Sequence, residues 1–425
     1  MDHFHYKFGR LFAEEVEVRQ IVEAVGTPCY IYSKATFLDH LAKVQQAYSP
    51  IGTLVCFSVK ACANIHILRL LAEAGSGFDV VSGGELFRVL KAGADPKKVV
   101  YAGVGKTDAE IRQALNAGIA YFNVESEQEL QVVIDIAEQD RRSAKVALRV
   151  NPDVEYQTHA YTATGQKQTK FGIDIDRILA IFQQYGRHPR VRLCGLHVHL
   201  GSGGKLTSPY VEAVQKVLPL IEVLRKQGLM IEVLDLGGGY GAEYESGSVP
   251  LPEDYAAAIL PLLEGQGLRL ILEPGKSICA NAGILVTRVL YTKQSGSKRF
   301  VIVDAGMNDL IRPALYDAFH FIWPVEVPEE LVPVRRSRRL LFEGLETVDV
   351  VGPICESADF LAKDRPLPRV QRSDLLAVFT AGAYGFTMSS NYNARPRGPE
   401  VLVDKDGFRI IRRRETYQDL IAPEQ

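Results

Sequence analysis

The sequence predicts an α/β protein, with a (β/α)8 barrel of the TIM type followed by a mostly antiparallel β-domain. Between residues 54 and 273, eight short apolar strands alternate with segments of helical periodicity, which favours a closed barrel over an open doubly wound sheet. After Gly275 strands follow one another with little helix between them. Charged and glycine-rich motifs also fall at the ends of several barrel strands, where barrels of this type carry their sites.

Each predicted barrel strand is a run of mainly apolar residues. The eight runs cover residues 54–59, 77–81, 99–102, 121–124, 146–150, 193–199, 232–236 and 268–273. The helical segments between them include residues 65–73, 109–116, 127–138, 175–185, 211–227 and 255–264. Ser126 and Glu129 fit a capping box at the start of the third of these helices.

The second domain is predicted from six further strands. They cover residues 284–292, 299–304, 341–351, 375–379, 401–403 and 409–412, and the last two are expected to pair. Residues 28–33 are also strand-like, although they precede the first barrel unit.

Composition places the chain among ordinary globular proteins, with 47% hydrophobic residues and a net charge of -2. That charge gives no general attraction to nucleic acid or to an anionic membrane, and the arginine-rich run at residues 335–339 is interpreted as a solvated loop. Because neither a signal peptide nor an apolar run long enough to cross a bilayer is present, we expect a cytoplasmic protein. The six cysteines are scattered, so neither disulfides nor a metal site are expected.

Lys60 directly follows the apolar run of the first barrel strand. A lysine at the end of a buried strand tends to have a lowered pKa, which makes it a nucleophilic amine suited to Schiff-base chemistry. Taken by itself, the structural alternative is a lysine whose stem packs while its ammonium reaches water.

Three further motifs supply the other parts that a pyridoxal phosphate enzyme needs. The glycine-rich run at residues 237–241 ends the seventh strand and can bring backbone close to a phosphate, although a tight structural turn is the alternative. Glu273 ends the eighth strand, where it could keep a pyridine nitrogen protonated or simply pair with a lysine. His197 and His199 alternate on the sixth strand and therefore share one face.

Six motifs occur in a fixed order along the chain. They are FSVKA at residues 57–61, HLGS at 199–202, GGG at 237–239, EPG at 273–275, GPICES at 352–357 and GAYG at 382–385. In this order they resemble the alanine-racemase-fold, group IV pyridoxal-phosphate decarboxylases, and within that group the diaminopimelate decarboxylase family. The resemblance extends from Phe8 to about Tyr417, and six ordered motifs are far more specific than any one alone.

The resemblance implies a role for particular residues. The catalytic residues would be Lys60, which holds the cofactor, His199, which stacks on its ring, Glu273, which faces its nitrogen, and Cys355, supplied by a partner subunit. The implied cofactor contacts are Lys60, Asp79, Arg149, His199, Ser202, Gly237, Gly238, Gly239, Glu273, Pro274, Gly275, Lys276 and Tyr384. The implied substrate contacts are Lys276, Arg312, Tyr316, Glu356 and Tyr384.

Several of these residues have a structural alternative. Asp79 and Arg149 could belong to ion pairs within the barrel, and Arg312 could form a surface salt bridge. Cys355 could be a small buried hydrophobic residue, and His197 is interpreted as a core histidine. For Arg312 we favour binding of a carboxylate through two parallel hydrogen bonds, with Glu356 holding an ammonium; both suit a substrate with an amino acid group at each end.

The resemblance also implies the domain division: an N-terminal segment of residues 1–34 joining the β-domain, a barrel of residues 35–278, and a β-domain of residues 279–425. Three positions depart from the family pattern. Lys276 stands where arginine is usual, Phe57 where tyrosine is common and Cys62 where asparagine is common. These changes leave the required groups in place but bear on substrate choice.

The sequence therefore predicts a pyridoxal-phosphate-dependent carboxy-lyase, a homodimer with shared sites, that converts meso-2,6-diaminopimelate to L-lysine and carbon dioxide. After carbon dioxide has left, Cys355 or Lys60 would return a proton to the carbon that carried the carboxylate. One alternative is a decarboxylase of the ornithine, arginine or carboxynorspermidine type, whose substrates give Arg312 no carboxylate. Another is a non-catalytic regulatory homologue, which would be expected to have lost the lysine or the phosphate loop.

Overall fold

The computed structural model describes residues 2–154, 170–201, 203–247 and 249–424. The chain divides into two compact units. The barrel unit comprises residues 40–241 and 249–276, and the β-unit comprises residues 1–39, 242–248 and 277–425. The β-unit thus includes a short segment, residues 242–248, that lies inside the predicted barrel range of 35–278.

Eight parallel strands close the barrel. They are β5 (Thr53–Ser58), β6 (Gly77–Val80), β7 (Val99–Tyr101), β8 (Tyr121–Val124), β9 (Ala144–Asn151), β11 (Val191–His197), β12 (Val233–Asp235) and β13 (Arg269–Leu272). Neighbours pair in the order β9-β11-β12-β13-β5-β6-β7-β8, and a pairing of β8 with β9 closes the ring. The short strand β10 (Ile173–Asp174) adds to β9. The predicted barrel is confirmed, with strand ends within two residues of the expected ones.

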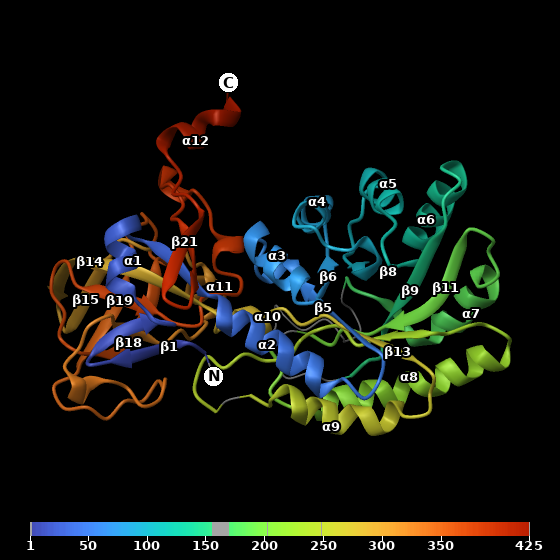
Figure 1. Cartoon of the computed structure of the whole chain (residues 1–425), viewed down its shortest axis with the longest axis horizontal. Helices are drawn as coiled ribbons and strands as arrows, with labels where there is room; N and C mark the ends of the chain where they lie inside the picture. Colours follow the sequence, from blue (N-terminus) through green and yellow to red (C-terminus); the bar gives the residue numbers. More distant parts are fainter. Residues whose placement is uncertain (1, 155–169, 202, 248, 425) are drawn as a thin grey trace. The chain divides into compact units, whose positions relative to one another are not determined.

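Helices follow the barrel strands, as expected for βα units (Figure 1). They are α3 (Ile65–Glu73), α4 (Gly83–Lys91), α5 (Asp108–Ala117), α6 (Glu127–Gln139), α7 (Ile175–Tyr185), α8 (Ser208–Lys226) and α9 (Pro252–Leu263), and α2 (Lys34–Ala47) precedes β5. Helices α8 and α9 pack side by side (Figure 1).

The capping box predicted at α6 is only half formed. Ser126 Oγ accepts the backbone N–H of Glu129 at 3.1 Å. The Glu129 carboxylate, however, accepts the N–H of Glu125 at 2.9 Å and pairs with Lys106 Nζ at 2.7 Å. The expected reciprocal bond is therefore replaced, because a buried ammonium offers this carboxylate a stronger partner.

Apolar side chains fill part of the barrel interior. Buried residues from β5, β7, β8, β11, β12 and β13 form one cluster: Leu54, Cys56, Val100, Tyr121, Cys194, Val233 and Ile271. Burying an aliphatic side chain of this size contributes about 1.5 to 3 kcal/mol. The barrel is therefore a packed core, and polar side chains collect at the carboxyl ends of its strands.

The β-unit contains a mixed but mostly antiparallel sheet, as predicted. Its strands are β4 (Cys29–Ser33), β14 (Gly283–Ser295), β15 (Lys298–Val303), β16 (Ile322–Pro324), β17 (Glu346–Val351), β18 (Phe360–Leu367), β19 (Leu375–Val378), β20 (Glu400–Asp404) and β21 (Gly407–Arg412). The order is β18-β17-β15-β14-β4-β20-β21, and β19 pairs with β14 and β16. Strand β4, from the N-terminal segment, lies between β14 and β20.

Smaller elements complete the β-unit. A separate sheet is formed by β1 (Phe4–Lys7), β2 (Arg10–Ala13) and β3 (Val16–Glu17). The helices are α1 (Val18–Val25), α11 (Arg312–Tyr316) and α12 (Tyr417–Ile421). Helix α10 (Lys276–Cys279) begins at the last residue of the barrel unit and continues into the β-unit. The strand predicted at residues 341–351 begins only at Glu346. Leu341 is fully exposed, so the apolar residues before Glu346 were wrongly assigned to the strand.

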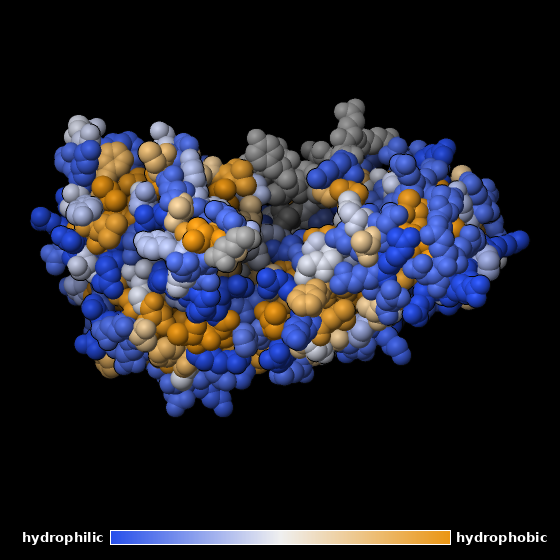
Figure 2. Space-filling model, turned by 90° about the horizontal axis from the view of Figure 1, so that it is seen from above, coloured by the Kyte–Doolittle hydropathy of each residue, from blue (hydrophilic) through white to orange (hydrophobic). Residues whose placement is uncertain are grey.

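None of the helices in the described part of the chain is both long and apolar enough to span a membrane. In Figure 2 hydrophilic residues make up most of the visible surface, and hydrophobic residues appear in smaller groups between them.

Candidate active site

Lys60 lies one turn beyond β5. The strand ends at Ser58, one residue earlier than predicted, and Val59–Ala61 form a single 3-10 turn that carries Lys60. Val59 and Ala61 are buried and anchor the turn, whereas the Lys60 side chain is 35% exposed. Its Nζ pairs with Asp79 Oδ2 at 2.7 Å. The amine is therefore held in a defined position and still has access to a ligand.

Asp79 is fully buried on β6 beside Lys60. Its Oδ2 also accepts the Ser58 hydroxyl at 2.9 Å. Burial raises the pKa of Asp79, and the nearby Glu273 carboxylate adds to the rise, while Lys60 opposes it. The ion pair that the sequence offered as an alternative for Asp79 is thus present, and it involves the central lysine.

Glu273 follows β13 and is almost fully buried. Its Oε1 accepts the side-chain amide of Asn123 at 2.9 Å, and its Oε2 lies 3.6 Å from His197 Nε2. Burial alone would raise the pKa of Glu273, but His197, through its charge and a hydrogen bond, and Lys60 hold that pKa below its usual value. Glu273 is therefore a buried anion. His197, interpreted as an ordinary core histidine, lies beside it and belongs to the site.

His199 presents a neutral ring to the site. Desolvation lowers the pKa of His199 well below its usual value, and the positive charge of Arg149 adds to the effect. Its Nδ1 accepts the backbone N–H of Gly238 at 3.1 Å, which assigns the ring proton to Nε2.

The glycine-rich loop after β12 admits no side chain at its first two positions. A Cβ at Gly237 would lie 2.5 Å from His199 Nδ1, and a Cβ at Gly238 would lie 2.1 Å from the Glu273 carbonyl oxygen. Gly237 also has a φ of +63°. The N–H groups of Gly237 and Gly238 are bound by Asp235 and His199, so these glycines bring the loop against the strand ends rather than leaving both amides for a ligand.

The other predicted cofactor residues of the barrel unit make different kinds of contact. Arg149 is buried and binds both oxygens of Glu125, at 2.8 and 3.0 Å, so the ion-pair alternative holds for its guanidinium. The Pro274 carbonyl accepts the N–H of Ser58 at 3.1 Å, and Gly275 lies close enough that an added Cβ would approach Ser58 Cβ at 3.0 Å. These contacts join β13 to the turn that carries Lys60.

Lys276, another member of the predicted set, lies near the loop that follows β11. Lys276 begins α10, and a Cβ built at Gly203 would lie 3.3 Å from its Nζ. Its ammonium is thus directed to the loop after β11. Ser202 lies outside the described residues.

Arg312 is a buried cation in the β-unit. It opens α11 and is 7% exposed. Its guanidinium lies over the rings of Tyr244 and Tyr316, at 5.2 and 5.8 Å from their centroids. Its Nε has no hydrogen-bond partner, and among the described residues no carboxylate pairs with it. The surface salt bridge offered as its alternative is therefore absent from the part of the chain that is described.

Cys355 and Glu356 are exposed in the β-unit, so the interpretation of Cys355 as a buried hydrophobic residue is wrong. Asp359 organises their loop by accepting the N–H groups of Ile354 and Met307, both at 2.6 Å. The N–H of Cys355 binds Asn393 Oδ1 at 2.8 Å. Tyr384, also in the β-unit, has a φ of +54°.

The described cysteines are all free, as expected. Ligand atoms of His197, His199 and Glu273 lie within 4.8 Å of one another, a donor set that could hold a metal ion. Sequence reasoning expected no metal site. Two of the three, His199 and Glu273, are close enough to Lys60 for its charge to affect their pKa values.

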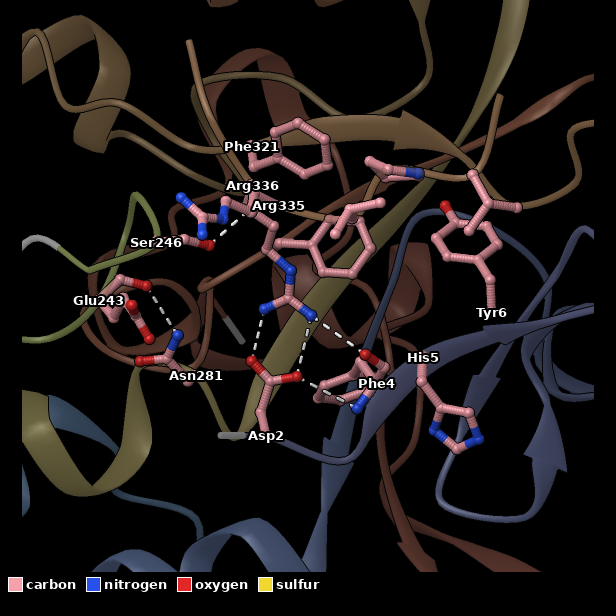
Figure 3. Close-up of a pocket in the computed structure, with 14 residues that line it drawn as sticks. Asp2, Phe4, His5, Tyr6, Glu243, Ser246, Asn281, Phe321, Arg335 and Arg336 are labelled. Atoms are coloured by element: carbon pink, nitrogen blue, oxygen red, sulfur yellow. Dashed lines mark hydrogen bonds and ion pairs between the residues drawn. The ribbon is translucent and has the colours of Figure 1, made fainter. Parts of the chain in front are cut away.

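The β-unit also contains a cavity of about 360 Å³, shown in Figure 3. None of the predicted site residues lines it. At its wall Arg336 binds both oxygens of Asp2, and its guanidinium lies 4.3 Å from the centroid of the Phe379 ring. The arginine-rich run is therefore not a freely solvated loop at Arg336, because an ion pair and an aromatic ring hold that side chain.

Sequence reasoning missed two buried polar residues of the barrel site, Asn123 and Asp235. The side-chain amide of Asn123 donates to Asp235 Oδ2 and to Glu273 Oε1, each at 2.9 Å. The available signal was the polar residue within each apolar strand, Tyr121–Val124 and Val233–Asp235. That signal marks an inward-facing polar group but not its partner.

The barrel site fits pyridoxal phosphate. Lys60 has a partly exposed amine that could react with the aldehyde, Glu273 is a buried anion that could face the ring nitrogen, and His199 has a flat neutral ring. The glycine loop lets backbone approach closely where any side chain would collide. Fold and site together define a barrel-type pyridoxal phosphate enzyme.

Comparison with known proteins agrees. Residues 34–280 match the family model described as pyridoxal-dependent decarboxylase, pyridoxal binding domain, and the chain belongs to this family. Its cofactor is pyridoxal phosphate.

Relatives narrow the family further. The diaminopimelate decarboxylase of Pseudomonas aeruginosa is 48% identical over 424 residues, covering 100% of this chain and 99% of that protein. That of Aquifex aeolicus is 46% identical over 422 residues, covering 99% and 97%. The crystal structure of diaminopimelate decarboxylase from Helicobacter pylori, complexed with L-lysine, superimposes with a TM-score of 0.89 at 39% identity, covering 96% of this chain and 98% of that one.

Proposed function

We propose that this enzyme decarboxylates meso-2,6-diaminopimelate to L-lysine and carbon dioxide. The observation that carries the proposal is Arg312, a buried cation that no carboxylate pairs with among the described residues. A buried charge of this kind needs a counter-ion, and a substrate carboxylate that the reaction leaves untouched would provide it. The names of the full-length relatives support the same substrate.

Pyridoxal phosphate, when bound, supplies an electron-accepting ring that takes up the electron pair left by the departing carbon dioxide. Lys60 holds the cofactor by its Nζ. Asp79 Oδ2, 2.7 Å from that nitrogen and raised in pKa, is the group placed to take a proton from it. Glu273, which stays ionised, would hold the ring nitrogen by its negative charge, and the neutral His199 ring would be available to stack on the cofactor ring.

Recognition of the distal end of the substrate falls to the β-unit. Arg312 binds the second carboxylate, with the Tyr316 ring beneath its guanidinium. Lys276 supports a phosphate or carboxylate as a point charge, and Tyr384 contributes its hydroxyl. Glu356 would bind the distal ammonium. Cys355 or Lys60 would return a proton to the carbon that has lost its carboxylate.

We infer that Cys355 and Glu356 act in the site of a second subunit, so that the enzyme is a homodimer with shared sites. Both side chains are exposed in the single chain, although Asp359 and Asn393 hold their loop in a defined conformation. An ordered loop that presents a thiol and a carboxylate to solvent is suited to completing a site on another chain.

Product analysis tests the substrate. The purified holoenzyme is incubated with meso-diaminopimelate, L-ornithine, L-arginine and L-lysine in parallel, and carbon dioxide and amine products are measured. We expect L-lysine from meso-diaminopimelate to dominate. A preference for any of the other three substrates would overturn the assignment, because those substrates offer Arg312 no second carboxylate.

Borohydride reduction tests the cofactor attachment. Reduction followed by peptide mapping should place the pyridoxyl group on Lys60. A label on any other lysine contradicts the role given to Lys60.

A further inference from the structure

We propose that Asp235 and Asn123 are positioning residues that hold the glycine loop and Glu273 in one fixed geometry, so that both ends of the cofactor are bound together. The proposal concerns cofactor binding. It rests on the pyridoxal site and is independent of which amino acid is the substrate.

A continuous chain of hydrogen bonds joins the two ends. Asp235 Oδ1 accepts the N–H of Gly237 at 2.8 Å, and its Oδ2 accepts Asn123 Nδ2 at 2.9 Å. The same nitrogen of Asn123 donates to Glu273 Oε1 at 2.9 Å. The side chains come from β12, β8 and the end of β13, so the chain of bonds crosses the barrel.

The backbone closes this chain into a loop. The N–H of Glu273 donates to the carbonyl of Gly237 at 2.7 Å. Gly237 is thus bound on its N–H by the Asp235 carboxyl group and on its carbonyl by the Glu273 backbone N–H. A displacement of the Asp235 side chain or of the Glu273 backbone would therefore displace the glycine loop. Among the described residues Asn123 makes no hydrogen bond to that loop, so it influences the loop through Asp235 and Glu273.

Hydrophobic packing does not explain why Asn123 and Asp235 are buried here. Asn123 and Asp235 are fully buried, and Asn123 Oδ1 has no hydrogen-bond partner among the described residues. Burial, and then the neighbouring Glu273 anion, raise the pKa of Asp235 well above its usual value, so Asp235 keeps a proton while Glu273 keeps the charge. Elsewhere the same strands fill the interior with apolar side chains, which would stabilise this region more than buried carboxyl groups do.

The test measures cofactor binding by the apoenzyme. Asn123→Ala and Asp235→Asn are compared with wild type and with Ser76→Ala, which removes a buried hydroxyl at the opposite end of the barrel, where Ser76 Oγ binds the Gly77 carbonyl at 2.7 Å. For each protein the Kd of pyridoxal phosphate, the Kd of inorganic phosphate and the thermal midpoint are determined. The absorbance of bound cofactor is recorded against pH.

We expect Asn123→Ala and Asp235→Asn each to bind pyridoxal phosphate about tenfold more weakly. Asn123→Ala removes a hydrogen bond to the Glu273 anion, and Asp235→Asn replaces an acceptor oxygen facing Asn123 Nδ2 with an amide nitrogen. Asn123→Ala should also bind inorganic phosphate about threefold more weakly, and the pH at which the bound cofactor changes its absorbance should shift. Ser76→Ala should stay within about twofold of wild type.

Two results would overturn the proposal. One is an Asn123→Ala protein whose phosphate affinity and absorbance titration match wild type, because Asn123 would then act on neither end. The other is an equal loss in Ser76→Ala, which would indicate general weakening of the barrel. If Asn123→Ala does not fold, Asp235→Asn decides by the same two readouts.

Discussion

Replacing Arg312 with methionine should greatly lower the activity of the enzyme but leave its stability nearly unchanged. In the free enzyme the Arg312 guanidinium has aromatic rings but, among the described residues, no carboxylate partner. Methionine keeps most of the side-chain volume and removes the charge. The free energy of unfolding should therefore stay within about 1 kcal/mol of wild type, because relief from an unpaired buried charge offsets the lost cation–π contacts.

Turnover should respond very differently. Without Arg312 the distal carboxylate of the substrate is desolvated and unpaired, which costs about 2 to 5 kcal/mol. At about 1.4 kcal/mol per factor of ten, kcat/KM for meso-diaminopimelate should fall roughly 30-fold to several thousand-fold. Carbon dioxide release at varied substrate gives kcat/KM, and urea unfolding gives the stability of the same preparations.

Two variants calibrate this comparison. Arg312→Lys keeps a positive charge and should recover part of the lost kcat/KM, since a point charge replaces the planar fork. Arg365→Met removes a buried arginine whose Nη1 donates to the His320 carbonyl at 2.6 Å, so it should lose about 1 to 3 kcal/mol of stability. The reasoning is refuted if Arg312→Met keeps kcat/KM within about threefold, or if it loses about 3 kcal/mol or more of stability, as breaking a buried ion pair would.

Three further predictions follow. Mixing inactive Lys60→Ala and Glu356→Ala chains should restore activity, because some heterodimers contain one intact site; no recovery under proven subunit exchange would favour sites built within one chain. Lys276→Arg should remain active, and loss of more than about tenfold in kcat/KM would show that the point charge matters. Burial raises the pKa of Glu85 from 4.5 to about 7, so its contribution to stability is full below pH 4.5 and is lost as the pH rises toward 7. In Glu85→Gln the free energy of unfolding, measured with urea, should therefore fall by about 1 to 3 kcal/mol less between pH 4.5 and 7 than in wild type. An unchanged pH dependence would assign this loss of stability to other groups.

The barrel could be predicted from the sequence because its signals are local. Apolar runs such as residues 121–124 coincide with the observed strand β8, and helices α3 and α7 have the expected ends. The site residues at strand ends could also be predicted, because the parallel strands of a barrel have their carboxyl ends at one rim. Lys60, Glu273 and the glycines were found in this way.

Side-chain partners depended on the tertiary structure. Asn123 is separated by 112 residues from Asp235 and by 150 from Glu273, and only closure of the ring brings these strands together. His197 was interpreted as a core histidine and Arg149 as a cofactor contact, yet His197 lies beside Glu273 and the Arg149 guanidinium is bound by Glu125.

Exposure was likewise decided by packing. Cys355 was predicted to be a catalytic residue of a partner subunit's site, with a small buried hydrophobic residue as the alternative, and the loop held by Asp359 leaves it exposed. Arg336 looked like part of a solvated run, yet it is paired with Asp2 across 334 positions of sequence. The sequence by itself determined the strands, the helices and the residues at strand ends, because hydrophobic periodicity acts over a few neighbours. The tertiary structure decided which charges meet and which remain exposed, because those contacts depend on how distant segments pack.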